Sequence, residues 1–131
     1  MRFEFIMLGC AILLALVHIG WAGQARTRQY GTDWNTGARD QAMPPLAPLA
    51  ARLQRAQANL FETLPLFMGA LLGAAACGHL GWQTQVGSGI YVAARVIYLP
   101  LYAAGVPVVR TLVWLVSMAG LMLILWALML G

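Results

Sequence analysis

The residues best suited to chemistry in this chain form two polar stripes at helical spacing. The first stripe comprises Arg52, Arg55, Asn59 and Glu62. Because they follow an i, i+3, i+7, i+10 pattern, these side chains share one face of a helix. A charged stripe that enters lipid is costly unless it faces a protein interior, a partner or a ligand. The first stripe is therefore a candidate for a sheltered polar site.

The second stripe places an arginine among phenols inside an otherwise apolar run. It comprises Tyr91, Arg95, Tyr98 and Tyr102. In one interpretation Arg95 pairs with Glu62 and the tyrosines act as interfacial anchors. In the other, both stripes line one polar site. The two interpretations are compatible, since a Glu62–Arg95 pair could also shape a pocket.

The charge balance of the expected site favours an anionic ligand. Its cations are Arg52, Arg55, Arg95 and Arg110. Against them stands one carboxylate, Glu62. Guanidinium groups suit carboxylates, and the amides of Gln57 and Asn59 suit a peptide-like ligand. Because Glu62 could hold an ammonium group, a ligand with two carboxylates, amides and one ammonium would match, and glutathione has that description.

The elements that carry these stripes are predicted to be membrane-spanning helices. The chain has 131 residues, of which 61% are hydrophobic and 9% charged, with a mean hydropathy of +0.74. A soluble domain carries about 25% charged residues. The composition predicts a single domain, 1–131, and an all-α integral membrane four-helix bundle. The expected spans are approximately 4–24, 50–79, 86–105 and 107–130.

The distribution of arginine predicts the topology. All eight cations are arginine, and most lie in or beside the loop at approximately 25–48 or before the fourth span. The positive-inside rule places that side in the cytoplasm and both termini in the periplasm. The loop is punctuated by glycine and proline and is expected to be irregular. The arginine-only composition, rich in alanine, leucine and glycine, suggests a GC-rich bacterial genome. The expected location is therefore the bacterial inner (cell) membrane.

Other classes of function are disfavoured. The arginines form no solvated basic patch of the kind that binds nucleic acid, so no nucleic-acid partner is expected. Two cysteines and two histidines fall short of a metal motif, so no metal is expected. A small four-span exporter needs a carboxylate inside its first helix, and this segment has no acid after Glu4.

Two motifs of the chain together match a known family. One is the run Arg55-x-Gln57-x-Asn59-x-x-Glu62-x-x-Pro65-x-Phe67, and the other is Arg95-x-x-Tyr98-x-x-x-Tyr102 with Arg110 following. The first resembles the second-helix signature, and the second the other half-site, of the MAPEG family, the membrane-associated proteins in eicosanoid and glutathione metabolism. The four spans, the long first loop and the chain length also agree, so the resemblance covers nearly the whole chain.

The resemblance implies a homotrimer that binds glutathione between neighbouring subunits, towards the cytoplasmic side. By position, glutathione would be held by Arg55, Asn59, Glu62, Tyr98 and Tyr102, with Gln57 reaching the site shared with the adjacent chain. Arg26 or Arg28 resembles the basic residue that a neighbour contributes. Arg110 would stabilise the thiolate, with Arg95 as the second candidate.

Two positions depart from the family pattern. Thr63 stands where the leukotriene-synthesising members have a tyrosine, which removes one glutathione contact. The spacing from Tyr102 to Arg110 also differs slightly from that branch. Arg110 could therefore either stabilise the thiolate or serve as a plain interfacial anchor.

The predicted function is that of a glutathione-dependent membrane transferase or peroxidase. It would activate the thiolate of glutathione, its co-substrate, for attack on lipophilic electrophiles or lipid hydroperoxides. The alternative is a non-catalytic bundle that binds a lipid or an anionic metabolite, or a subunit of a larger membrane complex. Both readings keep membrane lipids as the surroundings of the chain.

Overall fold

The computed structural model describes residues 2–131, and these residues form helices without any strand. The helices are α1 (Arg2–Tyr30), α2 (Thr32–Thr36), α3 (Pro48–Ala76), α4 (Trp82–Ala104) and α5 (Pro107–Leu130). The four longer helices are long and apolar enough to cross a membrane. The expected all-α fold with four spans is confirmed.

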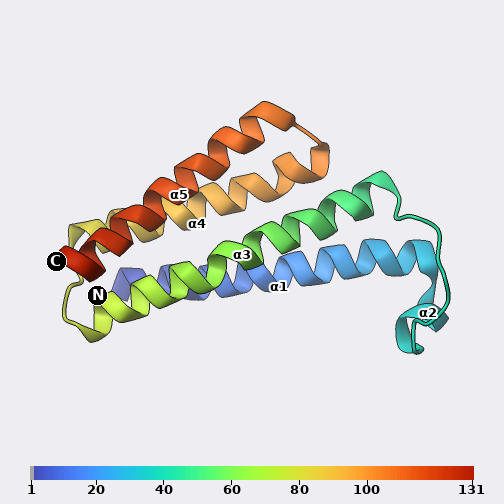
Figure 1. The fold of residues 1–131 in the computed structure, drawn as a ribbon, viewed down its shortest axis with the longest axis horizontal. Coiled ribbons are helices and arrows are strands. Elements are labelled where there is room, and N and C mark those ends of the chain that lie inside the picture. The colour runs from blue at the N-terminus through green and yellow to red at the C-terminus, as the bar shows by residue number, and fades with distance from the viewer. Residues whose placement is uncertain (1) are drawn as a thin grey trace.

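The four long helices run as two antiparallel pairs (Figure 1). Helix α1 packs along α3, and α4 packs along α5. Both termini and the α3–α4 turn lie at one end of the bundle, which we call the terminal end. The opposite end, the loop end, carries α2, the start of α3 and the α4–α5 turn. Because α3 and α4 run in opposite directions, the polar stripe near the start of α3 and the polar stripe towards the end of α4 both lie near the loop end.

Two helices extend further than the sequence pattern indicates. Helix α1 continues to Tyr30, past the expected end of the span at residue 24. Its last turns are polar but hold no helix breaker before Gly31, whose φ of 96° ends the helix. Helix α4 begins at Trp82, before the expected residue 86. There the Thr84 hydroxyl accepts a hydrogen bond from the Gly81 N–H at 2.9 Å and so caps the first turn.

The first loop is more ordered than a glycine- and proline-rich sequence suggests. It contains the short helix α2, and the end of α1 anchors the segment that follows. Gln29 donates to the Pro45 carbonyl at 2.9 Å and accepts from the Ala47 N–H at 2.6 Å. Tyr30 donates to the Pro44 carbonyl at 2.5 Å. Because these bonds join α1 to the residues before α3, they fix where the polar stripe of α3 begins.

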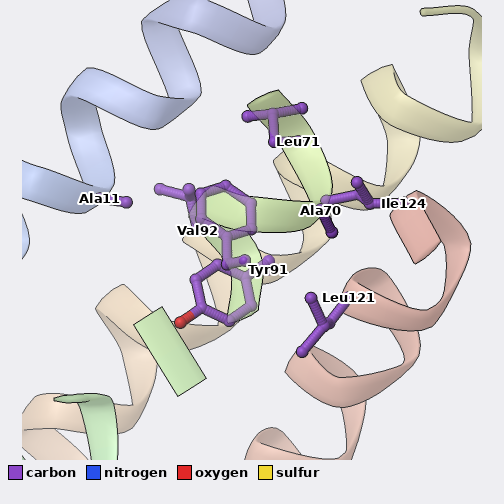
Figure 2. Packing of buried hydrophobic residues seen from close by; sticks show 8 residues of the cluster. Ala11, Ala70, Leu71, Tyr91, Val92, Leu121 and Ile124 are labelled. Atoms are coloured by element: carbon purple, nitrogen blue, oxygen red, sulfur yellow. The ribbon is translucent and has the colours of Figure 1, made fainter. Parts of the chain in front are cut away.

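The core at the centre of the bundle joins all four long helices. Figure 2 shows Tyr91 of α4 among Ala11, Leu71, Leu121 and other apolar side chains from α1, α3 and α5. The Tyr91 ring also stacks on Phe67, with ring centroids 4.2 Å apart. Since lipid tails are as apolar as these side chains, close packing rather than water exclusion favours this contact.

Of the two helix pairs, α4–α5 is the more closely packed. Its backbones approach each other where two glycines meet. A Cβ atom added to Gly87 would lie 2.6 Å from the Gly120 carbonyl oxygen. One added to Gly120 would lie 2.7 Å from the Gly87 oxygen and 2.9 Å from the Tyr91 nitrogen. Only glycine permits so close an approach of two backbones. The contact holds α4 and α5 together as a unit.

Candidate functional site

Arg95 is the centre of the candidate site. Its side chain is fully buried, and its Nη1 donates to Asn59 Oδ1 of α3 at 2.9 Å. Its guanidinium also lies over the ring of Tyr98, with Cζ 4.3 Å from the ring centroid. The Nε and Nη2 atoms of Arg95 are buried and have no hydrogen-bond partner among residues 2–131. The buried guanidinium therefore retains two nitrogen atoms whose N–H donors are unused.

Glu62 does not pair with Arg95. Its side chain is exposed, and it makes no hydrogen bond or ion pair with the other described residues. The interpretation of a Glu62–Arg95 ion pair is therefore wrong. The reason is the rotation of α3, whose buried face carries Leu60 and Thr63. Asn59 lies at the edge of that face, and Glu62, about 60° further round the helix, lies on the exposed side.

Two further arginines gather on the phenol rings of α4. Arg110 Nη1 donates to the Tyr98 hydroxyl at 3.4 Å, and its Cζ lies 4.6 Å from the Tyr102 ring centroid. Arg55 of α3 approaches the same ring, with Cζ at 6.0 Å. The two phenol rings meet edge to face with centroids 5.5 Å apart. The side chain of Arg110 thus turns towards α4 from the first turns of α5.

These contacts define one group, which we call the arginine–tyrosine cluster. Its members are Arg55, Asn59, Arg95, Tyr98, Tyr102 and Arg110. Three helices contribute to it, and no carboxylate of the described chain forms an ion pair with its arginines. Three guanidiniums without a paired carboxylate among residues 2–131 give the cluster an excess of positive charge, which would favour an anion there.

Four of the expected site residues lie outside the cluster. Gln57 is half-buried and Glu62 is exposed, and both make no hydrogen bond to it within residues 2–131. Arg26 lies over the Trp34 ring of α2, with Cζ 5.8 Å from the centroid. Arg28 is exposed and lines a cavity of about 320 Å³ between α1 and the start of α3. Within one chain, the structure does not bring these four residues to Arg95.

Thr63 contacts Tyr91 of α4 and is not a member of the arginine–tyrosine cluster. Its hydroxyl lies 2.9 Å from the Tyr91 hydroxyl, and both side chains are buried. The pair crosses from α3 to α4 one turn before Arg95. The spacing of Tyr91 and Arg95 on one face of α4 placed Tyr91 in the second stripe, but nothing in the sequence indicated its partner.

His18 is a polar side chain that the sequence pattern does not connect to the cluster. It is 1% exposed, and neither ring nitrogen has a hydrogen-bond partner in residues 2–131. It lies close enough to Arg95 for the two side chains to interact electrostatically. No polar residue shares its face of α1 in the sequence, so only the packing of α1 against α4 reveals this proximity.

Comparison with known families identifies the family of the chain. A model of the MAPEG family matches residues 5–130, which is nearly the whole chain. A comparison with curated proteins found no match. The match extends over nearly all of the four spans and includes every member of the arginine–tyrosine cluster. This chain is a multi-pass membrane protein and belongs to the MAPEG family.

Proposed function

We propose that this protein is a glutathione-dependent membrane transferase or peroxidase. The observation that carries the proposal is the arginine–tyrosine cluster, in which three guanidiniums meet without a paired carboxylate. The family is one of membrane proteins in eicosanoid and glutathione metabolism. Glutathione supplies two carboxylates and a thiol, which are the groups that guanidiniums bind or stabilise.

The position of Arg110 supports an anionic ligand. It lies in the first turns of α5, which begins at Pro107. The N-terminal end of a helix carries partial positive charge, so a cation there is unfavourable until an anion arrives. Hydrogen bonding to the Tyr98 hydroxyl uses one donor of Arg110, and the others remain for a ligand. An anion near these donors would offset both the charge of the Arg110 guanidinium and the partial positive charge at the N-terminus of α5.

The chemistry requires a thiolate close to a guanidinium. A free thiol has a pKa near 8.5, and a neighbouring cation lowers that pKa and raises the thiolate fraction at neutral pH. In transfer to an aryl halide, the thiolate sulfur forms a carbon–sulfur bond and the halide leaves. In peroxide reduction, the sulfur attacks one oxygen, the oxygen–oxygen bond breaks and the alcohol leaves. A second glutathione then releases the disulfide and water.

The remaining site residues fit an assembly of several copies. Gln57, Glu62 and Arg28 are accessible at the surface of a single chain. In the proposed homotrimer, Arg28 or Arg26 of one copy would approach the Glu62 face of the next and complete the ligand pocket. The arginines of the loop end would lie in the cytoplasm of a bacterial cell by the positive-inside rule. Lipophilic electrophiles would reach the site from the membrane.

The first test is binding of glutathione to the purified protein in detergent. A ligand that prefers the folded state stabilises it by about 2.7 kcal/mol at a concentration one hundred times its Kd. We expect saturating glutathione to raise the melting temperature and an aryl halide to be conjugated. Glutathione binding without turnover would favour the non-catalytic alternative, and no thermal shift at millimolar glutathione would contradict the proposal.

The second test asks whether Arg110 stabilises the thiolate of bound glutathione. Removing a donor that stabilises a developing anion costs about 10²–10³-fold in turnover. We therefore expect Arg110→Met to lower turnover by about that factor and to reduce the ultraviolet absorbance of bound thiolate. Arg39→Met is the matched control, because Arg39 is exposed in the first loop, where it bonds to Asn35 and lies over the Trp34 ring and is not a member of the cluster. Unchanged thiolate formation in Arg110→Met would refute this role.

A further inference from the structure

Arg52, at the start of α3, is bound to the far end of α4. Its Nε donates to the Ala103 carbonyl oxygen at 2.9 Å. Ala103 lies in the last turn of α4, where carbonyl groups have no partner within the helix. A cation at this position satisfies a free acceptor and interacts favourably with the negative end of the helix dipole. The hydrogen bond therefore ties α3 to the C-terminus of α4.

The turn that Arg52 contacts has a defined shape. Gly105 adopts the left-handed conformation, with φ of 77°, and its N–H donates to the Tyr102 carbonyl at 3.0 Å. The Val106 N–H donates to the Leu101 carbonyl at 3.1 Å. A Cβ added at Gly105 would lie 3.6 Å from both Cδ and Nε of Arg52. The Arg52 side chain thus packs on the turn as well as bonding to it.

This turn separates two members of the arginine–tyrosine cluster. Tyr102 lies in the last turn of α4, and Arg110 lies in the first turns of α5. Because only a few residues join them, a shift of the turn changes the distance between the Arg110 guanidinium and the rings of α4. We infer that Arg52 is a positioning residue, which holds the α4–α5 turn against α3 and so places Arg110 against the Tyr98 hydroxyl and the Tyr102 ring.

The geometry explains why arginine is suited to this position. The bond to Ala103 uses Nε, so the guanidinium plane lies along the turn. Lysine carries one compact ammonium on a flexible stem, so it can reach the carbonyl but cannot also cover the turn. Arg52→Lys should therefore retain part of the effect, whereas Arg52→Met, which keeps the apolar stem, should lose the hydrogen bond entirely.

Amide hydrogen exchange at the turn tests the contact without any ligand. A hydrogen bond to a charged group contributes enough that its loss should speed exchange about ten-fold. We expect Arg52→Met to show this increase at Gly105 and Val106, with exchange unchanged at the α3–α4 turn. Arg52→Lys should lie between Arg52→Met and the native protein. Equal exchange in Arg52→Met and the native protein would overturn the inference.

A double-mutant cycle tests the functional consequence, which rests on the proposed function. Misplacing a catalytic group by a small distance can cost about ten-fold or more in rate. We expect Arg52→Met to lower kcat about ten-fold and to move its pH profile to higher pH, because the thiolate would be less stabilised. Since Arg52 acts through Arg110, Arg52→Met/Arg110→Met should be no slower than Arg110→Met alone.

The two experiments separate failure of this inference from failure of the proposed function. If the free-energy costs of the two substitutions add, so that their effects on kcat multiply, Arg52 does not act through Arg110. Glutathione catalysis itself would still stand in that case. If no glutathione is bound or turned over by the native protein, the proposed function fails, while the exchange result still decides whether Arg52 holds the turn. Arg39→Met should leave both exchange at the turn and kcat unchanged.

Discussion

The two ends of the bundle differ in how their charged side chains are bonded. At the terminal end, the Thr84 hydroxyl donates to Glu4 Oε2 at 2.8 Å, and both side chains are fully buried. At the loop end, the guanidiniums of Arg55, Arg95 and Arg110 gather on two phenol rings without a paired carboxylate. The acid of the terminal end bonds within the chain, whereas the cations of the loop end retain unused donors.

This difference separates the part of the molecule that stabilises the fold from the part that could serve a ligand. A buried charge is costly unless it is hydrogen-bonded and compensated. At the terminal end, the hydrogen bond from Thr84 of α4 to Glu4 of α1 meets part of that requirement. At the loop end, the neutral oxygen of Asn59 satisfies one donor of Arg95, but it cannot neutralise the charge. An anion from outside the chain would complete the arrangement.

The largest expected effect comes from breaking the packing on the terminal side of the bundle. Gly120→Leu places a side chain where the Gly87 oxygen lies 2.7 Å from a new Cβ. Overpacking costs about 1–3 kcal/mol and occasionally more, and here the obstructing atoms are backbone. We expect the folded fraction in detergent to fall sharply, as measured by thermal unfolding.

The matched control for this substitution is Gly9→Leu. Gly9 also lies in a helix, but a Cβ added there has nothing within 4 Å. We expect this variant to keep the melting temperature of the native protein in detergent. Equal loss of folded protein in both variants would show that the close α4–α5 contact has no special part in stability.

A smaller effect is expected from removing the hydroxyl that binds the buried acid. Thr84→Val deletes the hydrogen bond to Glu4 and the cap at Gly81, so it should lower stability by about 1–3 kcal/mol. Thr111→Val is the control, because the Thr111 hydroxyl is exposed and bonds only within its own helix. Chemical unfolding in mixed micelles compares the two. A Thr84→Val variant as stable as Thr111→Val would mean that the terminal end gains nothing from this contact.

The smallest effect on stability is expected from the most buried cation. Arg95→Met replaces an uncompensated charge by an apolar chain of similar length, a change that is often neutral or stabilising. We expect the stability of the ligand-free protein to stay within about 1 kcal/mol of the native value, or to rise. The stabilisation by glutathione should fall steeply in the same variant. A large loss of ligand-free stability would show that Arg95 holds the loop end together and would remove the contrast between the ends.

The sequence was sufficient to predict the class of fold and the membership of the stripes. Long apolar segments have few stable structures in lipid other than helices, because each backbone polar group must find a partner within the chain. Helical spacing then predicts which side chains share a face, and Arg95, Tyr98 and Tyr102 do lie together. Spacing on separate helices does not predict which residues meet. It leaves a Glu62–Arg95 pair open as one interpretation, whereas in the structure Arg95 bonds to Asn59.

Composition and periodicity by themselves determined four apolar helices, two polar stripes and an excess of arginine over acid. Only the tertiary structure decided that α3 presents Asn59 to Arg95, that Thr63 meets Tyr91 and that Arg52 caps α4. The physical reason is that periodicity is a property of one helix, whereas the rotation and depth of two packed helices depend on every side chain between them. Between α3 and α4, close contacts such as the stacking of Phe67 on Tyr91 contribute to that register.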